Sequence, residues 1–178
     1  MTYIKLQDAI WAWPNRVFNY EGDPAEPLPP ESIVPIIWAN ESGPRPTRSY
    51  IALHILTDNH VGRTNESLVR ITGAPPNQVG TQTLRWNKDL TLNVQAFGPL
   101  AHQYLQTLEE SLALLVVQDL FGAAGLALRD IGDIKDIGEA LDEQAEPRAS
   151  MDLIIGWAVA VEQQPGWIEQ VDYAGTTA

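Results

Sequence analysis

The chain has 178 residues, of which 44% are hydrophobic, so it is long and apolar enough to form one folded domain rather than a disordered chain. Its formal net charge is −12 at pH 7, which disfavours specific binding to the phosphate backbone of nucleic acids. It has no cysteine, which excludes disulfides and thiolate metal sites, and no apolar run approaches the roughly 18 residues of a membrane-spanning helix.

The N-terminal segment is predicted to be an amphipathic helix. Apolar residues recur there at three-four spacing: Tyr3, Leu6, Ile10, Trp13 and Val17. Pro14 removes a backbone N–H inside this pattern, so we expect the helix to kink or end near Trp13. Residues 21–35 follow with five prolines, which predicts an extended connector.

Two shorter strands are predicted before residue 80. Residues 49–57 alternate loosely and are expected to form a central strand that is buried on both faces in places. Residues 67–72 are a further strand candidate. The polar stretch 58–80, which contains Arg63 and Arg70, is predicted to be a projecting hairpin or flap.

Residues 84–96 carry the clearest pattern in the chain. Apolar and polar residues alternate with period two, and only Lys88 breaks this pattern. The alternation predicts a long strand with one solvent-exposed face. An amphipathic helix is predicted next, with Pro99 at its first position. Its apolar stripe is expected to contain Ala101, Tyr104, Leu105, Leu108, Leu112 and Leu115. This strand and helix predict half of a two-layer α/β sandwich.

The last part of the chain is predicted to add a helix and two strands. Residues 116–125 form a short helix that Gly125 ends, and residues 151–161 and 167–173 form strands. Between them, acidic residues fall at every third position: Asp130, Asp133, Asp136, Glu139 and Asp142. A calcium loop spaces its ligands differently, so this ladder is interpreted as a solvated acidic edge rather than a metal site.

Together these elements predict an α+β fold, with a mixed, mostly antiparallel sheet packed against amphipathic helices. Strands 50–57 and 151–161 are expected to be the sheet partners of strand 84–96. The whole chain, 1–178, is predicted to be one domain, with the connector at 21–35 and the flap at 58–80.

No catalytic or metal-binding pattern is present in the sequence. His54, His60 and His102 lie far apart and show no metal-ligand spacing, and no nucleophile elbow or phosphate-binding glycine loop occurs. We therefore expect no enzymatic activity, cofactor or metal. Paired catalytic carboxylates among the 15 acidic residues after residue 88 remain the enzymatic alternative.

The charges are distributed unevenly along the chain. Residues 45–88 contain six basic and two acidic residues, whereas residues 89–178 contain three basic and 15 acidic ones. In one interpretation, a positive strip on one copy meets a negative surface on the next copy or on a partner. In the other, the charges are scattered over a solvated surface.

Several short runs, in a consistent order from residue 37 onward, resemble the neck or tail terminator proteins of contractile-tailed bacteriophages. These runs are Ile37-Trp38-Ala39-Asn40, Pro44-Arg45-Pro46 with Tyr50-Ile51, Leu92 to Gly98, Gly125-Leu126-Ala127, Glu146 to Ala149 with Met151 to Leu153, and Gly166 to Glu169. Pro14 and the proline-rich stretch depart from the family's pattern.

The resemblance implies a structural virion protein of the tail or neck, made in the bacterial host cytoplasm. It implies a tail-terminator-like sandwich that assembles into a ring, expected to be hexameric, which terminates the tail tube and joins it to the head-side connector. The implied partners are further copies of the chain, the tail tube protein, the sheath and connector proteins. DNA is expected to pass through the ring without specific binding, and no membrane contact is implied.

The subunit contacts are predicted from the charge distribution. Arginines of the basic segment, Arg45, Arg48, Arg63 and Arg70, are expected to face acidic residues of the neighbouring copy, Asp130, Asp133, Asp136 and Glu139. The alternatives are another phage morphogenesis protein, such as a head completion or tube protein, and a small soluble enzyme.

Overall fold

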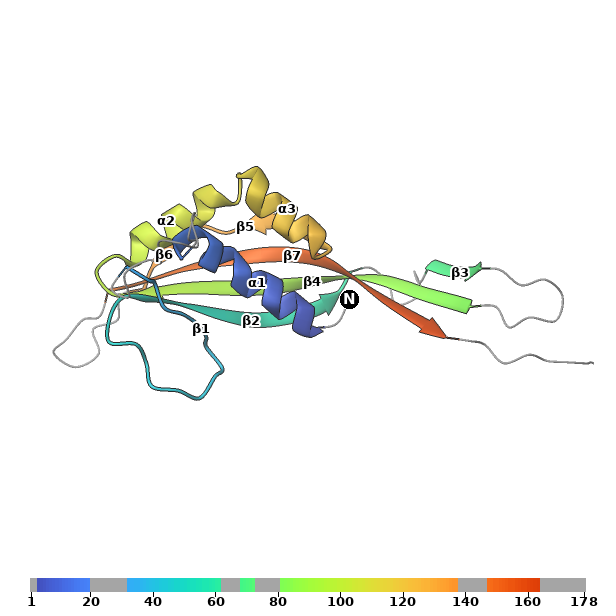
Figure 1. Ribbon diagram of the computed structural model, residues 1–178, viewed down its shortest axis with the longest axis horizontal. Coiled ribbons are helices and arrows are strands. Elements are labelled where there is room, and N and C mark those ends of the chain that lie inside the picture. Colours follow the sequence, from blue (N-terminus) through green and yellow to red (C-terminus); the bar gives the residue numbers. More distant parts are fainter. Residues whose placement is uncertain (1–2, 20–31, 62–67, 73–80, 138–146, 164–178) are drawn as a thin grey trace, which may run out of the picture.

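The computed structural model describes residues 3–19, 32–61, 68–72, 81–137 and 147–163, which form two layers (Figure 1). Within these ranges, one layer is a sheet of seven strands and the other contains three helices. β1 (Ile36–Trp38) pairs with β2 (Tyr50–His60) in parallel, and every other pairing is antiparallel. The predicted α+β fold with a mixed, mostly antiparallel sheet is confirmed.

Two long strands form the middle of the sheet. β7 (Arg148–Gln163) pairs along its whole length with β4 (Thr81–Phe97), and the strand order is β1-β2-β4-β7-β5. β5 (Leu126–Ile131) and the short β6 (Lys135–Asp136) pair with β7, and β3 (Leu68–Thr72) pairs with β4. The predicted partners of strand 84–96 are therefore confirmed.

We expected a kink or an end near Trp13; the N-terminal helix, α1 (Tyr3–Phe18), runs through Pro14, so it does not end there. An interior proline costs a helix about 3 kcal/mol. Leu6, Ile10 and Trp13 are fully buried, and burying each such side chain contributes about 1.5–3 kcal/mol. Val17 and Phe18, after the proline, also pack against the core, so packing along the helix offsets the cost of Pro14.

The second helix, α2 (Ala101–Ser111), begins after a turn that contains Gly98 and Pro99, so Pro99 does not occupy the first helical position. The chain turns again at residues 112–114 and continues as α3 (Leu115–Ala123). Gly125 follows α3 with a φ of 67°, as the sequence predicted for a glycine that ends a helix. Leu115 does not belong to the buried stripe of α2, because this turn carries it to the surface, where it is 76% exposed.

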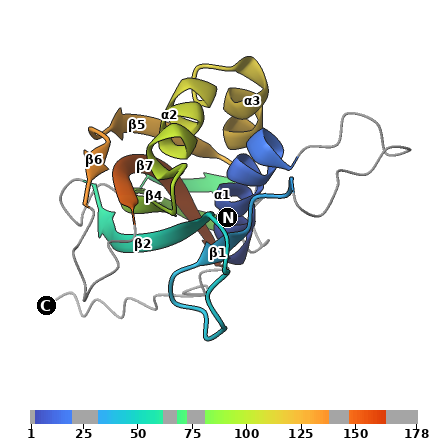
Figure 2. The same cartoon turned by 90° about the vertical axis from the view of Figure 1, so that its left-hand side faces the viewer.

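The main core lies between the helices and one face of the sheet, which Figure 2 shows in a view down the long axis of the molecule. Its fully buried members include Leu6, Ile10 and Trp13 of α1, Leu105 and Leu108 of α2, and Leu92, Leu153 and Ile155 of the sheet. The Trp13 indole N–H donates to the Ser111 hydroxyl at 3.0 Å and joins α1 to the end of α2.

The sheet is longer than the helical layer. β3 and the adjoining parts of β4 and β7 continue past the helices (Figure 1). Asp58 to His60 belong to β2, and Leu68 to Thr72 to β3, while residues 62–67 and 73–80 lie outside the described ranges. The flap at 58–80 therefore stays a prediction. Most of the connector at 21–35 and all of the predicted strand 167–173 also lie outside the described residues.

Candidate interaction surfaces

The three histidines that were considered as metal or catalytic residues do not meet. His54 is half-buried on β2, His60 is exposed near the end of the same strand, and His102 is exposed on α2. Within the described ranges, no three His, Asp or Glu side chains are grouped as metal ligands would be. None of the helices described is long and apolar enough to cross a membrane.

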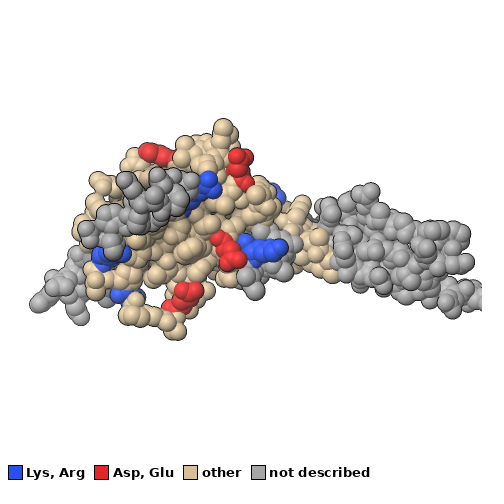
Figure 3. All heavy atoms as spheres, in the orientation of Figure 1, with Lys and Arg blue, Asp and Glu red and all other residues tan. Residues whose placement is uncertain are grey.

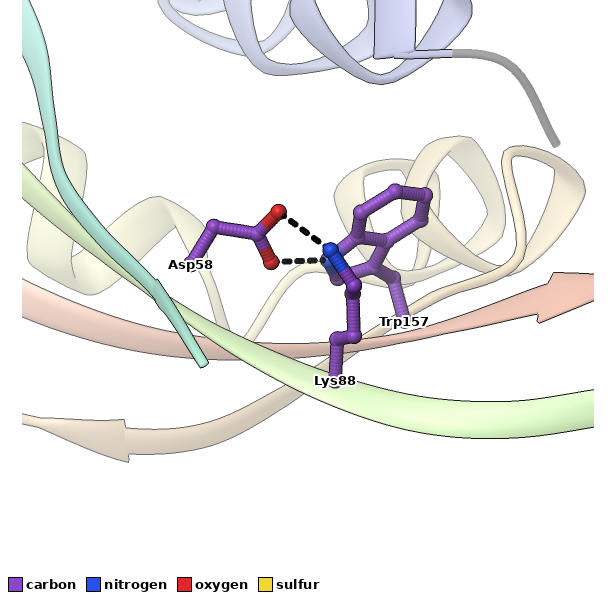
Figure 4. A network of polar contacts seen from close by, with 3 residues as sticks. All are labelled: Asp58, Lys88 and Trp157. Carbon is purple, nitrogen blue, oxygen red and sulfur yellow. Dashed lines mark hydrogen bonds and ion pairs between the residues drawn. The ribbon is translucent and has the colours of Figure 1, made fainter. Parts of the chain in front are cut away.

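A polar cluster lies where the helical layer ends and the sheet continues (Figure 4). Lys88 donates to Asp58 at 2.7 Å, and the Trp157 indole N–H donates to the other oxygen of the same carboxylate at 3.2 Å. The Lys88 ammonium nitrogen also lies 5.3 Å from the centre of the Trp157 ring. In the alternating pattern of strand 84–96, Lys88 occupies an apolar position, because its side chain lies on the helix side of the sheet. At this boundary the helices no longer cover the sheet completely, so the ammonium group keeps contact with solvent.

The face of the sheet opposite the helices carries a hydrogen-bonded row of polar side chains rather than separately solvated ones. Arg148 donates to Gln95 at 2.5 Å, Gln95 donates to Asn93 at 2.5 Å, and Asn93 donates to Asp152 at 2.7 Å. Asn93 is only 7% exposed. The two amides thus connect a cation at the start of β7 to a carboxylate further along the same strand. Each side chain in this row donates a hydrogen bond to the next one.

A second link crosses the helix-free face further along the sheet. The guanidinium of Arg129, from β5, lies 2.7 Å from the Asp89 carboxylate of β4, although β7 runs between these strands. Arg129 passes over Gly156, where an added Cβ would lie 2.4 Å from its Nε atom. A glycine at this position therefore leaves the space through which the ion pair forms.

A hollow of about 210 Å³ lies on the same face, beside the loop that follows β1. The rings of Tyr50 and Phe97 stack there with centroids 4.5 Å apart, and the Arg148 guanidinium carbon lies 4.9 Å from the centre of the Phe97 ring. The charged residues of the lining are Arg45, Arg148 and Glu41. The hollow thus combines a flat aromatic wall with two cations and one carboxylate.

The residues predicted for the subunit contact are partly described. Arg45 and Arg48 are exposed in the loop between β1 and β2, and Asp130, Asp133 and Asp136 are exposed on or between β5 and β6. Arg70 lies on β3, where only its backbone is described, and Arg63 and Glu139 lie outside the described ranges. Arg45 lies in the loop beside β1 and Asp130 lies on β5, so these two residues lie near opposite edges of the sheet. On the face seen in Figure 3, basic and acidic side chains are interspersed.

Two surface features were not found by sequence reasoning. Arg148 was not singled out, because it precedes the predicted strand 151–161; the β4–β7 pairing places it opposite Phe97, where it hydrogen-bonds to Gln95. An apolar corner formed by Leu114, Leu115 and Val116 is exposed between α2 and α3. Beside it, a groove of about 360 Å³ between α3 and β5 is lined by Leu112, Val117, Phe121, Leu126 and Leu128, among others.

A search of curated proteins gives no match to this chain. The family model described as phage neck terminator protein matches residues 5–178, which is nearly the whole sequence. The match covers all three helices except the first residues of α1, and every described strand. It agrees with the resemblance found in the sequence and supports a structural role in the neck of a phage tail. The chain therefore belongs to the phage neck terminator family.

Proposed function

We propose that this neck terminator is a subunit of a six-membered ring that ends the tail tube of a contractile-tailed phage. The ring would join the tail to the head-side connector and contact the tube protein, the sheath and connector proteins. DNA would pass through its channel without specific binding, which the net charge of −12 supports, because an acidic protein repels phosphates overall.

The observation that carries the ring is the separation of charges within one copy. Arg45 and Arg48 lie beside β1 at one edge of the sheet, and Asp130 and Asp133 lie beside β5 near the opposite edge. Two different surfaces that complement each other form head-to-tail contacts, and such contacts close into rings when the rotation allows it. Arg63 and Arg70 belong to the proposed basic surface, and Asp136 and Glu139 to the proposed acidic one.

The charge arrangement can be tested by reversing the charge of each surface in a separate variant. One variant carries Arg45→Glu and Arg48→Glu, and the other carries Asp130→Lys and Asp133→Lys. Each alone places like charges at every contact, so native mass measurement at moderate salt should show smaller species than the wild-type ring. An equimolar mixture should restore the ring, because the two variants can alternate around an even-numbered ring with opposite charges at every contact.

The matched control is Glu109→Lys with Glu110→Lys, which changes the charge as much as the aspartate variant but on the exposed side of α2. This control should keep the wild-type mass. A wild-type chain that stays monomeric at high concentration, or reversed variants with unchanged mass, would contradict the proposal. Restoration of even-membered rings in the mixture would in addition support the copy number of six over an odd number.

A further inference from the structure

Arg148 lacks a direct acidic partner in the described part of the chain. One terminal nitrogen of its guanidinium donates to Gln95, and the Phe97 ring packs against it. Its Nε atom is buried and has no hydrogen-bond acceptor among the described residues, so a group from another copy cannot reach that atom. An arginine presents several N–H donors in one plane, and Arg148 also lines the hollow beside Phe97. The part of the guanidinium that faces the hollow can therefore receive an acceptor from another copy.

The hollow beside Arg148 fits an acidic side chain. Arg45 and Arg148 line it with Glu41, which leaves one net positive charge. No ion pair joins Glu41 to either arginine among the described residues. Arginine binds a planar carboxylate with two parallel hydrogen bonds, and the Tyr50–Phe97 wall supplies an apolar surface for the methylene stem.

We propose that this hollow binds the carboxylate of Asp130 from the neighbouring copy; this inference rests on the proposed ring. Asp130 pairs with Ile154 of β7, so it points to the helix-free face, the same face on which the hollow opens. It is exposed at the edge of the sheet opposite β1. A neighbour whose β5 edge lay under the helix-free face beside β1 would bring this carboxylate to Arg45 and Arg148, which line the hollow. Each contact is incomplete without the partner's aspartate.

Cysteine cross-linking tests this contact directly, because the natural chain has no cysteine. Chains that carry Gly43→Cys and chains that carry Ile131→Cys are mixed under mild oxidation, and the disulfide-linked heterodimer is measured. Gly43 lines the hollow, Ile131 follows Asp130 in the chain, and both are exposed, so these substitutions leave the charged groups of the contact in place. The control pairs Gly43→Cys with Glu109→Cys, on the exposed side of α2. We expect the yield of the Ile131 pair to exceed that of the control pair about tenfold, because a specific contact holds the two cysteines together longer than random collision does.

The role of Arg148 is tested by adding Arg148→Gln to the Gly43→Cys chain. Loss of its charged hydrogen bonds should lower the heterodimer yield about tenfold, whereas Lys5→Gln, an equal charge change on exposed α1, should not. A circular dichroism spectrum checks that Arg148→Gln folds. If it does not, Asp130→Asn in the otherwise natural chain provides the second arm, with association expected to weaken about tenfold in native mass measurements.

The results separate this inference from the proposed ring. Rings without the cross-link between Gly43→Cys and Ile131→Cys, or a cross-linking yield equal to that of the control pair, would contradict binding in the hollow but not the proposed ring. Cross-linked pairs without closed rings would support the hollow and contradict the ring. Absence of both rings and cross-links would contradict both proposals. Unchanged association in Arg148→Gln and Asp130→Asn would contradict only the proposal that the hollow binds Asp130.

Discussion

At the scale of single residues, the hydrogen bond between Trp13 and Ser111 should be the most costly polar contact to break in the core. The Ser111 hydroxyl accepts from Trp13 at 3.0 Å and donates to the carbonyl of Leu108 at 2.6 Å. Ser111→Ala leaves the buried indole N–H without an acceptor, so we expect a loss of about 1–3 kcal/mol in the free energy of unfolding, measured by urea denaturation.

Thr107 provides the matched control for that measurement. Its hydroxyl also donates to a backbone carbonyl of α2, that of Gln103, but it is exposed and accepts from no side chain of the described residues. Thr107→Ala should change the free energy of unfolding by no more than about 0.5 kcal/mol. Equal effects at Ser111 and Thr107 would show that the helix end, rather than the link to Trp13, determines the cost.

At the scale of elements, the two leucines that the sequence assigned to one stripe should behave differently. Leu108 is fully buried against the sheet, whereas Leu115 is 76% exposed. Leu108→Ala should cost about 2–5 kcal/mol in the free energy of unfolding, and Leu115→Ala should stay within about 0.5 kcal/mol. Thermal and urea denaturation of the two variants check this, and a large loss at Leu115 would mean that the α2–α3 corner packs within the single copy.

The contrast between Leu108 and Leu115 shows what hydrophobic periodicity can and cannot predict. Alternation identified the long strands and the sheet partners correctly, because burial of one face imposes period two along a strand. The helical period continued through residues 112–114, and nothing in the spacing revealed that the chain turns there. Similarly, the pattern predicted a kink or an end near Trp13, because it does not include the packing of Ile10 and Trp13 that lets the helix continue through Pro14.

The candidate surfaces depended on information that periodicity lacks. The sequence assigned Asn93 and Gln95 to one face, but a face does not specify register, and only the β4–β7 register places them beside Asp152 and Arg148. Charge counts separated a basic segment from an acidic one. The strand order then put Arg45 and Asp130 near opposite edges of the sheet, an arrangement that composition does not contain.

At the scale of the whole molecule, two electrostatic effects should oppose each other during assembly. Copies with a net charge of −12 repel one another over long distances, while complementary edges attract at contact. The Debye length falls from about 30 Å at 0.01 M salt to about 10 Å at 0.1 M and about 3 Å at 1 M. Added salt therefore screens the long-range repulsion first and the contact pairs only at higher concentration.

Association of the wild-type chain should accordingly strengthen between about 0.01 and 0.1 M salt and weaken again toward about 1 M. Sedimentation velocity across a salt series measures this dependence. Asp130→Asn removes one contact charge but leaves most of the net charge, so its association should be weaker throughout and should decline less between 0.1 M and 1 M. A steady rise of wild-type association up to 1 M would mean that apolar surfaces, such as the corner at Leu114 and Leu115, hold the copies together instead of the charged edges.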